Sequence, residues 1–291
     1  KGDCEIQRSR IVVEDSELED SNTQISLSEA RLIDEDFEVG EEVSEQVEFA
    51  KFGRRAILNL RQTLASKILE LQKDVLYNKY KDLIGRITSA EVYQTWKSES
   101  LLIDDENNEL LLPKNQQIPR DFFHKGDTIR AVIDHVDNTN GNPKIYLSRS
   151  SNLFLQRLLE QEIPEIADGI IRLQGVARIP GERAKVAVES YDDRIDPIGA
   201  CIGVKGSRIM GIVRELRNEN IDVIQWSQNP QLMIQRALNP AHVSSIDMGQ
   251  SSEDKVKVFM QPDQVNKGIG RHGVNIKLAG MLVDREIEVW R

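Results

Sequence analysis

The chain has 291 residues, a mass of 33.1 kDa and a formal net charge of −10, from 48 acidic and 38 basic side chains. Its length predicts about two or three domains, and its 39% hydrophobic content excludes a disordered chain. No apolar run is long enough to span a membrane and no secretory leader is visible, while the net charge argues against a protein whose whole surface binds nucleic acid.

Residues 1–50 carry most of the negative charge. They contain 16 acidic and 4 basic side chains, whereas the remaining 241 residues contain 32 acidic and 34 basic ones. The apolar stretches Ile11–Val13 and Ile25–Leu27 indicate short strands, and Phe37–Gly40 ends an acidic loop. A block of like charge usually faces solvent, but an acidic face can also dock a basic partner protein. The charge argument against nucleic acid therefore applies to one end of the chain only.

A long helix is predicted from about Phe49 to Tyr80. Apolar residues recur there at three- and four-residue steps over some seven turns, and no proline interrupts them. A helix of this length acts as a spacer as much as a core element. Because the sequence starts at Lys1, we also expect the chain to be a piece of a longer protein. The recurring apolar positions are Phe52, Ala56, Leu60, Leu64, Ile68, Leu71 and Val75.

From Leu83 the hydrophobic period shifts toward two, which is typical of strands. Five short strands separated by turn residues predict a small closed barrel of the OB class, although such barrels serve many functions. Aromatic residues of this region are either core fillers or exposed platforms on which bases stack; they are Trp96, Phe122, Phe123 and Tyr146. The candidate strands are Ile84–Thr88, Leu101–Ile103, Leu110–Leu112, Ile129–Ile133 and Ile145–Leu147.

After Ser151 a pattern repeats. Residues 196–209 read DPIGACIGVKGSRI, and residues 263–276, which begin 67 positions later, read DQVNKGIGRHGVNI. Both copies share Asp, then Ile-Gly-x-x-Gly, then Ile at identical spacing. Each copy lies in the order helix, strand, strand, helix, Gly-x-x-Gly turn, helix, strand. The repeat therefore predicts two modules of the same fold.

Each Gly-x-x-Gly turn has a chemistry suited to a phosphate backbone. Glycines permit a tight turn and the close approach of a polynucleotide. The helix that follows offers free N–H groups and a partial positive charge to phosphate oxygens. Lys205 and Arg271 lie inside the two turns, and Arg208 and Lys277 lie just beyond them. A groove beside such a turn suits about four unstacked nucleotides, as in KH domains.

A single Gly-x-x-Gly is more often an ordinary turn between two helices. Dinucleotide binding fits worse, because neither turn follows a strand directly, and the P-loop pattern Gly-x-x-x-x-Gly-Lys-Ser/Thr does not occur. Two copies in register inside matched modules, each with a basic residue in the turn, favour tandem KH domains.

The residues of these modules resemble a known family. Residues 183–188 (RAKVAV), 194–206 (RIDPIGACIGVKG) and 221–230 (IDVIQWSQNP) closely resemble the first KH domain of the NusA family of bacterial transcription factors. Residues 268–279 (GIGRHGVNIKLA) are similar to its second KH domain, and the barrel, with Gly126–Asp127 and Leu147–Ser150, to its S1 domain. The resemblance implies a multidomain α+β protein. Its parts would be the end of an N-terminal RNA polymerase-binding domain with a long linker helix (1–80), a five-stranded S1 or OB barrel (81–150) and two tandem type II KH domains (151–229 and 230–291).

The family resemblance also implies a function. It predicts a cytoplasmic, monomeric factor that rides on bacterial RNA polymerase, binds the single-stranded nascent transcript, works with other Nus-type elongation factors, and modulates pausing, termination and antitermination. The alternative is the RNA-capture subunit of an RNA-degrading assembly, since such subunits also combine S1 and KH modules. A capture subunit should be attached to phosphorolytic or ring-forming sequence, whereas here a long helix joins an acidic segment to the barrel.

Candidate RNA-binding residues follow from the two turns and from the family motif. His272 occupies a turn position where the family pattern predicts a small amide such as Asn. Arg183 and Lys185, on the strand beside the first turn, and Arg149, at the end of the barrel, are weaker candidates. The turn candidates are Gly203, Val204, Lys205, Gly206, Ser207, Arg208, Gly270, Arg271, His272, Gly273, Asn275 and Lys277.

We expect no catalytic site, metal or cofactor. The four histidines are scattered without a Cys or His at ligand spacing, and the two cysteines, Cys4 and Cys201, lie far apart. Cys201 lies on an apolar helix face, which predicts a buried core residue rather than a nucleophile. The carboxylates of Asp104–Glu106 have no second cluster beside them, so they indicate a hairpin loop rather than a two-metal site.

Overall fold

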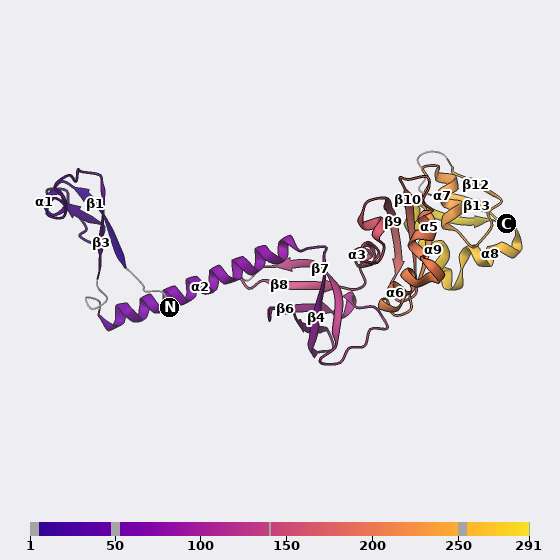
Figure 1. The fold of residues 1–291 in the computed structure, drawn as a ribbon, viewed down its shortest axis with the longest axis horizontal. Helices are drawn as coiled ribbons and strands as arrows, with labels where there is room; N and C mark the ends of the chain where they lie inside the picture. Colours follow the sequence, from indigo (N-terminus) through magenta and orange to yellow (C-terminus); the bar gives the residue numbers. More distant parts are fainter. Residues whose placement is uncertain (1–5, 48–52, 140, 250–254, 291) are drawn as a thin grey trace. The chain divides into compact units, whose positions relative to one another are not determined.

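The computed structural model describes residues 6–47, 53–139, 141–249 and 255–290 (Figure 1). Its contacts divide the chain into two compact units, Lys1–Gln72 and Lys73–Arg291. Within the described ranges, no helix is long and apolar enough to cross a membrane.

The first unit is built on a three-stranded sheet. Strand β1 (Gln7–Val13) lies between β2 (Gln24–Ser26), to which it is parallel, and β3 (Glu42–Gln46), to which it is antiparallel. The short helix α1 (Leu27–Ala30) begins after Ser26, whose hydroxyl accepts a hydrogen bond from the Glu29 N–H. The sequence pattern misses β3, because its residues are mostly polar and only Val43 points into the core. That small core consists of Val12, Ile25, Ala30 and Val43.

Helix α2 (Arg54–Asp82) confirms the predicted long helix and ends two residues later than expected. The start of the predicted span, including Phe49 and Phe52, lies outside the described residues. Tyr80 is the buried residue of the helix, and the apolar positions from Leu64 to Val75 are exposed. The Tyr80 hydroxyl donates a hydrogen bond to the Asp104 carboxylate of the barrel, so the C-terminal end of α2 is anchored there.

The expected five-stranded closed barrel is confirmed, with strand order β4-β5-β6-β8-β7. Its strands are β4 (Ile87–Thr95), β5 (Glu99–Ile103), β6 (Glu109–Pro113), β7 (Thr128–Asp137) and β8 (Lys144–Ser148). The predicted first strand at Ile84–Thr88 is placed three residues too early, because the turn through Gly85, with φ +81°, follows α2 there. Asp104 forms a hairpin turn with Glu106 and Asn108, as expected for a structural loop.

The barrel aromatics fall into two groups. Phe123 is buried in the core, and Tyr146 is partly buried with its ring stacked on His135 at 4.6 Å between centroids. Trp96 and Phe122 are exposed, Phe122 by 72% of its surface. Phe123 is therefore a core residue, whereas Trp96 and Phe122 are exposed, and the stacking of bases on them stays a prediction.

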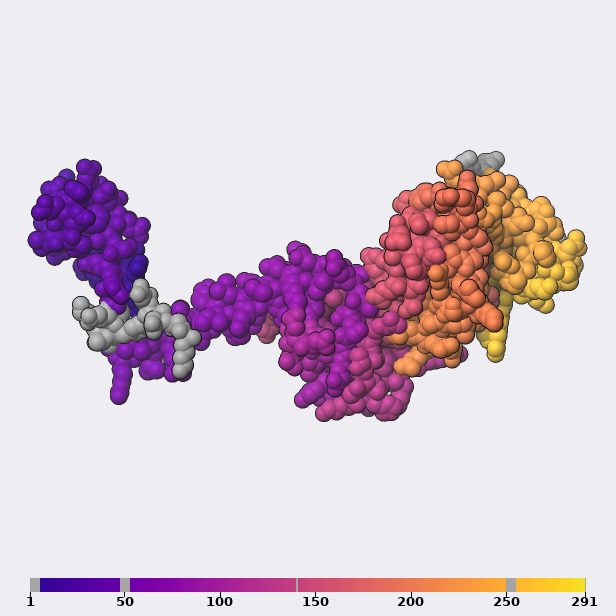
Figure 2. Space-filling view, viewed as in Figure 1, coloured from indigo at the N-terminus to yellow at the C-terminus, as the bar shows by residue number. Residues whose placement is uncertain are grey.

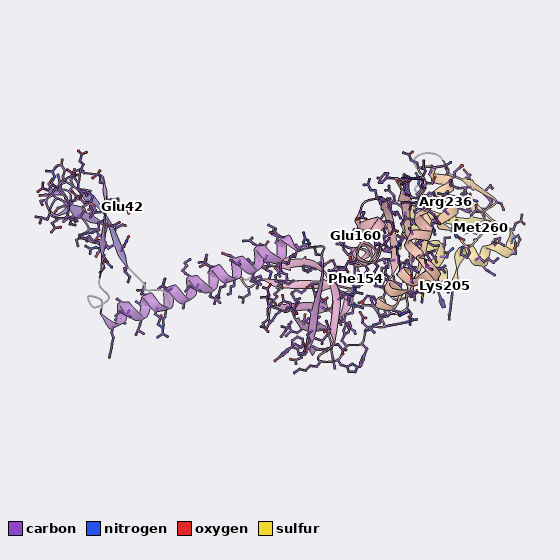
Figure 3. All side chains as sticks on the ribbon, viewed as in Figure 1. Glu42, Phe154, Glu160, Lys205, Arg236 and Met260 are labelled. Carbon is purple, nitrogen blue, oxygen red and sulfur yellow. The ribbon has the colours of Figure 1, made fainter. Side chains whose placement is uncertain are left out.

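The first KH module follows the predicted order of elements. It consists of α3 (Asn152–Glu162), α4 (Pro164–Ala167), β9 (Ile171–Ile179), β10 (Arg183–Ser190), α5 (Pro197–Ile202), the 3-10 turn η3 (Val204–Gly206), α6 (Ser207–Glu215) and β11 (Asn220–Gln225). The central strand β10 is antiparallel to β9 and parallel to β11. Helix α3 supplies Phe154, labelled in Figure 3, to the core on the sheet.

The second KH module repeats this order, which confirms the internal repeat. It consists of α7 (Pro230–Ala237), β12 (Ser245–Asp247), β13 (Lys255–Phe259), α8 (Pro262–Ile269), η4 (Arg271–Gly273), α9 (Val274–Val283) and β14 (Glu286–Trp290). The central strand β13 is again antiparallel to one neighbour and parallel to the other. Helix α9 packs against β9 and β10, so the two modules contact each other over this face. Figure 2 shows the surfaces of the two modules adjoining each other.

Ion pairs join the barrel to the first KH module. The guanidinium of Arg149 binds Asp121 of the barrel at 2.8 Å and Glu215 of α6 at 2.8 Å, and Arg217 binds Asp121 at 2.9 Å. Burial alone would raise the pKa of Glu215, but its bonds to Arg149 and Arg130 outweigh this and leave the pKa below its usual value. The interface between the barrel and the first KH module is therefore held by ion pairs whose charges are matched.

Candidate nucleic-acid interface

The two Gly-x-x-Gly turns have the same backbone. Corresponding φ and ψ angles differ by at most 4° between the copies. Lys205 and His272, each third in its turn, both adopt the left-handed conformation with φ 53°. After glycine, this conformation is best tolerated by Asn, the small amide expected in place of His272. Each turn therefore holds a larger side chain, Lys205 or His272, in an uncommon backbone conformation.

The first glycine of each turn is required by packing. A Cβ on Gly203 would lie 2.8 Å from the Cγ of Arg208, and one on Gly270 would lie 2.6 Å from the Cβ of Asn275. The last glycine of each turn is not enclosed, since a Cβ on Gly206 would lie 3.6 Å from Met210 and one on Gly273 would meet nothing within 4 Å. Space beside Gly206 and Gly273 is therefore open to a ligand.

Helices α6 and α9 begin directly at these turns with no side chain capping them. Gly206 and Gly273 are the N-cap residues, and neither offers a hydrogen-bond acceptor to the first N–H groups. Lys205 (Figure 3) and Arg271 are exposed within the turns and form no hydrogen bond or ion pair with another described residue. Each turn thus joins a helix N-terminus to one free cation, which is the arrangement that binds phosphate oxygens.

Other predicted residues of the turns have structural partners. Arg208 folds back, and its Nη1 binds Glu165 and the carbonyl of Ala200, both at 2.8 Å. Asn275 is buried, and its Nδ2 donates to three backbone carbonyls, whereas its Oδ1 has no partner among the described residues. Arg208 and Asn275 therefore shape the turns. Val204, Ser207 and Lys277 are exposed at or just beyond them.

Lys185 and Arg149 are not exposed as RNA contacts would need to be. Lys185 is fully buried and its Nζ donates to Asp222 at 3.2 Å and to the carbonyl of Asn239 at 3.0 Å, so it links the two KH modules. Burial lowers the pKa of Lys185, and Asp222 opposes this shift. Arg149 is buried in the junction with the barrel, while Arg183 is partly exposed and pairs with Asp222 at 2.7 Å. The sequence pattern shows the charges but not the distant carboxylates that engage them.

Residues of the second turn, the first module and a barrel loop line one pocket that is open to solvent. Its volume is about 440 Å³, and it is here called the junction cavity. Sequence reasoning missed Arg120, Asn218 and Asn220, which belong to no motif and converge only in the folded chain. The residues lining the cavity are Arg120, Gly181, Glu182, Arg183, Asn218, Asn220, Gly270, Arg271, His272, Val274 and Asn275.

A second cavity, of about 390 Å³, lies beside the first module's outer strand. Ile198 of α5 forms one side, Val223 and Gln225 of β11 form another, and residues 239–242 of the second module close the end. Apolar and polar side chains together line this groove between helices α5 and α7 and the edge strand β11. A groove of this kind, close to a Gly-x-x-Gly turn, suits unstacked bases.

Two other kinds of site, for a dinucleotide and for a metal ion, do not match the described residues. Gly268, Gly270 and Gly273 match the Gly-x-Gly-x-x-Gly spacing of dinucleotide sites, but Gly268 lies inside helix α8 and Gly270 ends that helix, whereas the motif requires a preceding strand. No group of three or more His, Cys, Asp or Glu side chains in the described ranges is placed to hold a metal ion. Cys201 is buried, as expected.

Cys201 is expected to resist alkylation in the folded protein. Burial raises the pKa of its thiol to about 11, which lowers the thiolate fraction at pH 8 by about 200-fold relative to an ordinary cysteine. Iodoacetamide labelling at pH 8, followed by mass spectrometry of the peptide that contains Cys201, should be at least about 100-fold slower in native protein than in protein unfolded by guanidinium. Equal rates would contradict the buried placement.

Comparisons with known protein families match three regions of the chain. Models of the NusA-like first KH domain, the NusA-like second KH domain and the NusA N-terminal domain match residues 149–226, 230–291 and 1–74. A protein of Thermus thermophilus is 37% identical over 286 residues, covering 98% of this chain and 73% of the relative. A protein of Bacillus subtilis is 34% identical over 274 residues, covering 94% and 73%. Both relatives are named transcription termination/antitermination protein NusA.

Proposed function

Since the chain belongs to the NusA family of transcription termination/antitermination proteins, we propose that it is an RNA-binding elongation factor that associates with bacterial RNA polymerase and modulates pausing, termination and antitermination. The observation that carries this proposal is the pair of superimposable turns, each with an uncapped helix and a free cation. The family supports this reading over an RNA-capture subunit.

We assign RNA binding to the part of the chain from the barrel to the second KH module. The two turns would hold backbone phosphates, and the groove beside β11 would take bases. Residues 81–291 contain 27 basic and 30 acidic side chains, a net charge of −3, so electrostatic attraction to RNA should be limited to local positive sites such as the turns, modest in strength and sensitive to salt. Weak contact of this kind suits a factor that follows a moving transcript while another contact keeps it in place.

We assign that other contact, the one with polymerase, to the N-terminal unit. Its surface carries exposed Leu32 and Ile33 next to the acidic residues Asp34–Asp36. Apolar side chains within a charged rim are typical of protein interfaces. In this proposal the factor acts as a monomer in the bacterial cytoplasm, where transcription takes place, together with other Nus-type factors.

Two binding measurements test the proposal. Fluorescence anisotropy with a labelled single-stranded RNA should show binding at 50 mM salt that falls with a slope of log K against log salt steeper than about −1.4, because two turns neutralise at least two phosphates. Immobilised protein should also capture purified bacterial RNA polymerase core. If the wild-type protein binds no RNA, the RNA-binding part of the proposal is contradicted. If it captures no polymerase core, the part that concerns polymerase is contradicted.

A further inference from the structure

The junction cavity is built by three parts of the chain. Arg120 comes from the barrel, Arg183 from the first KH module and Arg271 from the second turn. Gly181 packs against the barrel so closely that a Cβ there would lie 3.0 Å from Ile118. Next to Arg120, Asp121 is held by Arg149 and Arg217. The cavity wall is therefore fixed by buried contacts.

The cationic groups of the cavity differ in whether they are already paired. Arg183 is committed to Asp222 by two bonds, at 2.7 and 3.0 Å. Arg120 and Arg271 are exposed and form no hydrogen bond or ion pair with another described residue. The acidic residue among the lining side chains is the exposed Glu182. Arg120 and Arg271, whose guanidinium groups are unpaired among the described residues, thus line one cavity together with one acidic residue, Glu182.

We propose that the junction cavity is a phosphate site for single-stranded RNA, in which Arg120 of the barrel and Arg271 of the second turn hold one stretch of backbone. The inference rests on the proposed RNA-binding function and adds the barrel to the surface of the second turn. Guanidinium groups bind phosphate through paired hydrogen bonds, which makes arginine suited to this role.

Other groups in the cavity fit a nucleotide better than a bare anion. Asn218 and Asn220 line it with amide groups that can donate or accept hydrogen bonds. Asn275 also lines the cavity, and its buried Oδ1 accepts no hydrogen bond from the described residues. A volume of about 440 Å³ accommodates a nucleotide with its phosphate.

The first test replaces Arg120 by glutamine. Affinity for a 12-nucleotide single-stranded RNA at 50 mM salt should fall about fivefold, and the salt slope should become shallower by about 0.7, the value for one phosphate contact with a single strand. The matched control is Arg86→Gln, which removes an exposed arginine of the same barrel that lies outside the cavity. Glu182→Gln should strengthen binding, because it removes the opposing charge.

A double-mutant cycle tests whether the two arginines act on the same phosphates. If they do, the fold-loss of RNA affinity in the double variant Arg120→Gln/Arg271→Gln should be clearly smaller than the product of the fold-losses in the two single variants. Lys205 lies in the other turn, so the fold-loss in Arg120→Gln/Lys205→Gln should equal the product of the single fold-losses. Adenosine monophosphate and inorganic phosphate, each at 1000-fold excess over the RNA, distinguish the occupants: weak competition supports a polynucleotide site, whereas complete displacement overturns it in favour of a small-anion site.

The outcomes separate the two proposals. A wild-type protein that binds no RNA overturns both. Wild-type binding that is unchanged by Arg120→Gln, or weakened equally by Arg86→Gln, overturns the junction site and leaves the RNA-binding function standing. If the double variant Arg120→Gln/Arg271→Gln loses RNA affinity by the full product of the two single fold-losses, the shared site is also overturned. Thermal unfolding of each variant, monitored by circular dichroism, should match the wild type, because neither arginine has a partner among the described residues.

Discussion

Replacing Gly206 and Gly273 together by aspartate is expected to weaken single-stranded RNA binding by about 30-fold. Each carboxylate would stand at a helix N-terminus where phosphate is expected, and repulsion of roughly 1 kcal/mol per turn gives that factor. The fold should persist, since a side chain at either position meets at most ordinary contact and aspartate tolerates positive φ better than most residues. Anisotropy with labelled RNA at low salt measures the loss.

The matched control is Gly206→Asn with Gly273→Asn. Asparagine has the same size and tolerates the same backbone conformation but carries no charge, so the difference between the two variants isolates electrostatic repulsion. An affinity equal to that of the wild type in the aspartate variant would contradict phosphate binding at the turns. Equal losses in both variants would show that bulk, rather than charge, blocks the site.

Removing the Glu219 side chain should cost the C-terminal unit about 3–5 kcal/mol of unfolding free energy. Glu219 is fully buried, receives two bonds from Arg178, at 2.7 and 3.0 Å, and also accepts the Gly181 N–H at 2.8 Å. In Glu219→Ala the buried guanidinium would lose its counter-charge. Denaturant unfolding followed by circular dichroism is the measurement.

Glu160→Ala supplies the comparison for this variant. Glu160 (Figure 3) pairs with Arg157 at 2.6 Å in the same unit, but both side chains are more than a third exposed. Exposed pairs contribute about 0–1 kcal/mol, so this variant should unfold almost like the wild type. Similar stability losses in the two variants would refute the difference that burial predicts.

The parts of the fold that were predictable are those set by local chemistry. The repeat, the turn glycines and the barrel strands between Asn- and Asp-rich turns are visible in short windows of sequence. Strand β3 was missed because its register, with one inward residue, leaves almost no apolar pattern. Barrel strand β4 was placed too early because the apolar residues that end helix α2 continue into the turn before it.

The backbone of the two turns was predictable from the motif, whereas the long-range pairing of other candidate residues was not, and RNA binding at all of them stays a prediction. The uncapped helices and free cations at the turns follow from the motif itself. Lys185 and Arg149 resemble surface cations in sequence, yet their partners Asp222 and Asp121 lie 37 and 28 residues away. Arg120 carries no local signal, because its place beside the second turn depends on how three parts of the chain pack together.

The matching geometry of the two turns has a consequence for how their specificity can diverge. Flanking glycines set the backbone, so the two residues between them, Val204–Lys205 in one copy and Arg271–His272 in the other, can vary without disturbing it. In the proposed RNA-binding site, a duplicated module could therefore change its nucleotide contacts by changing these two side chains alone. Exchanging the two dipeptides between the copies is expected to exchange the nucleotide preferences of the turns while leaving their backbone unchanged.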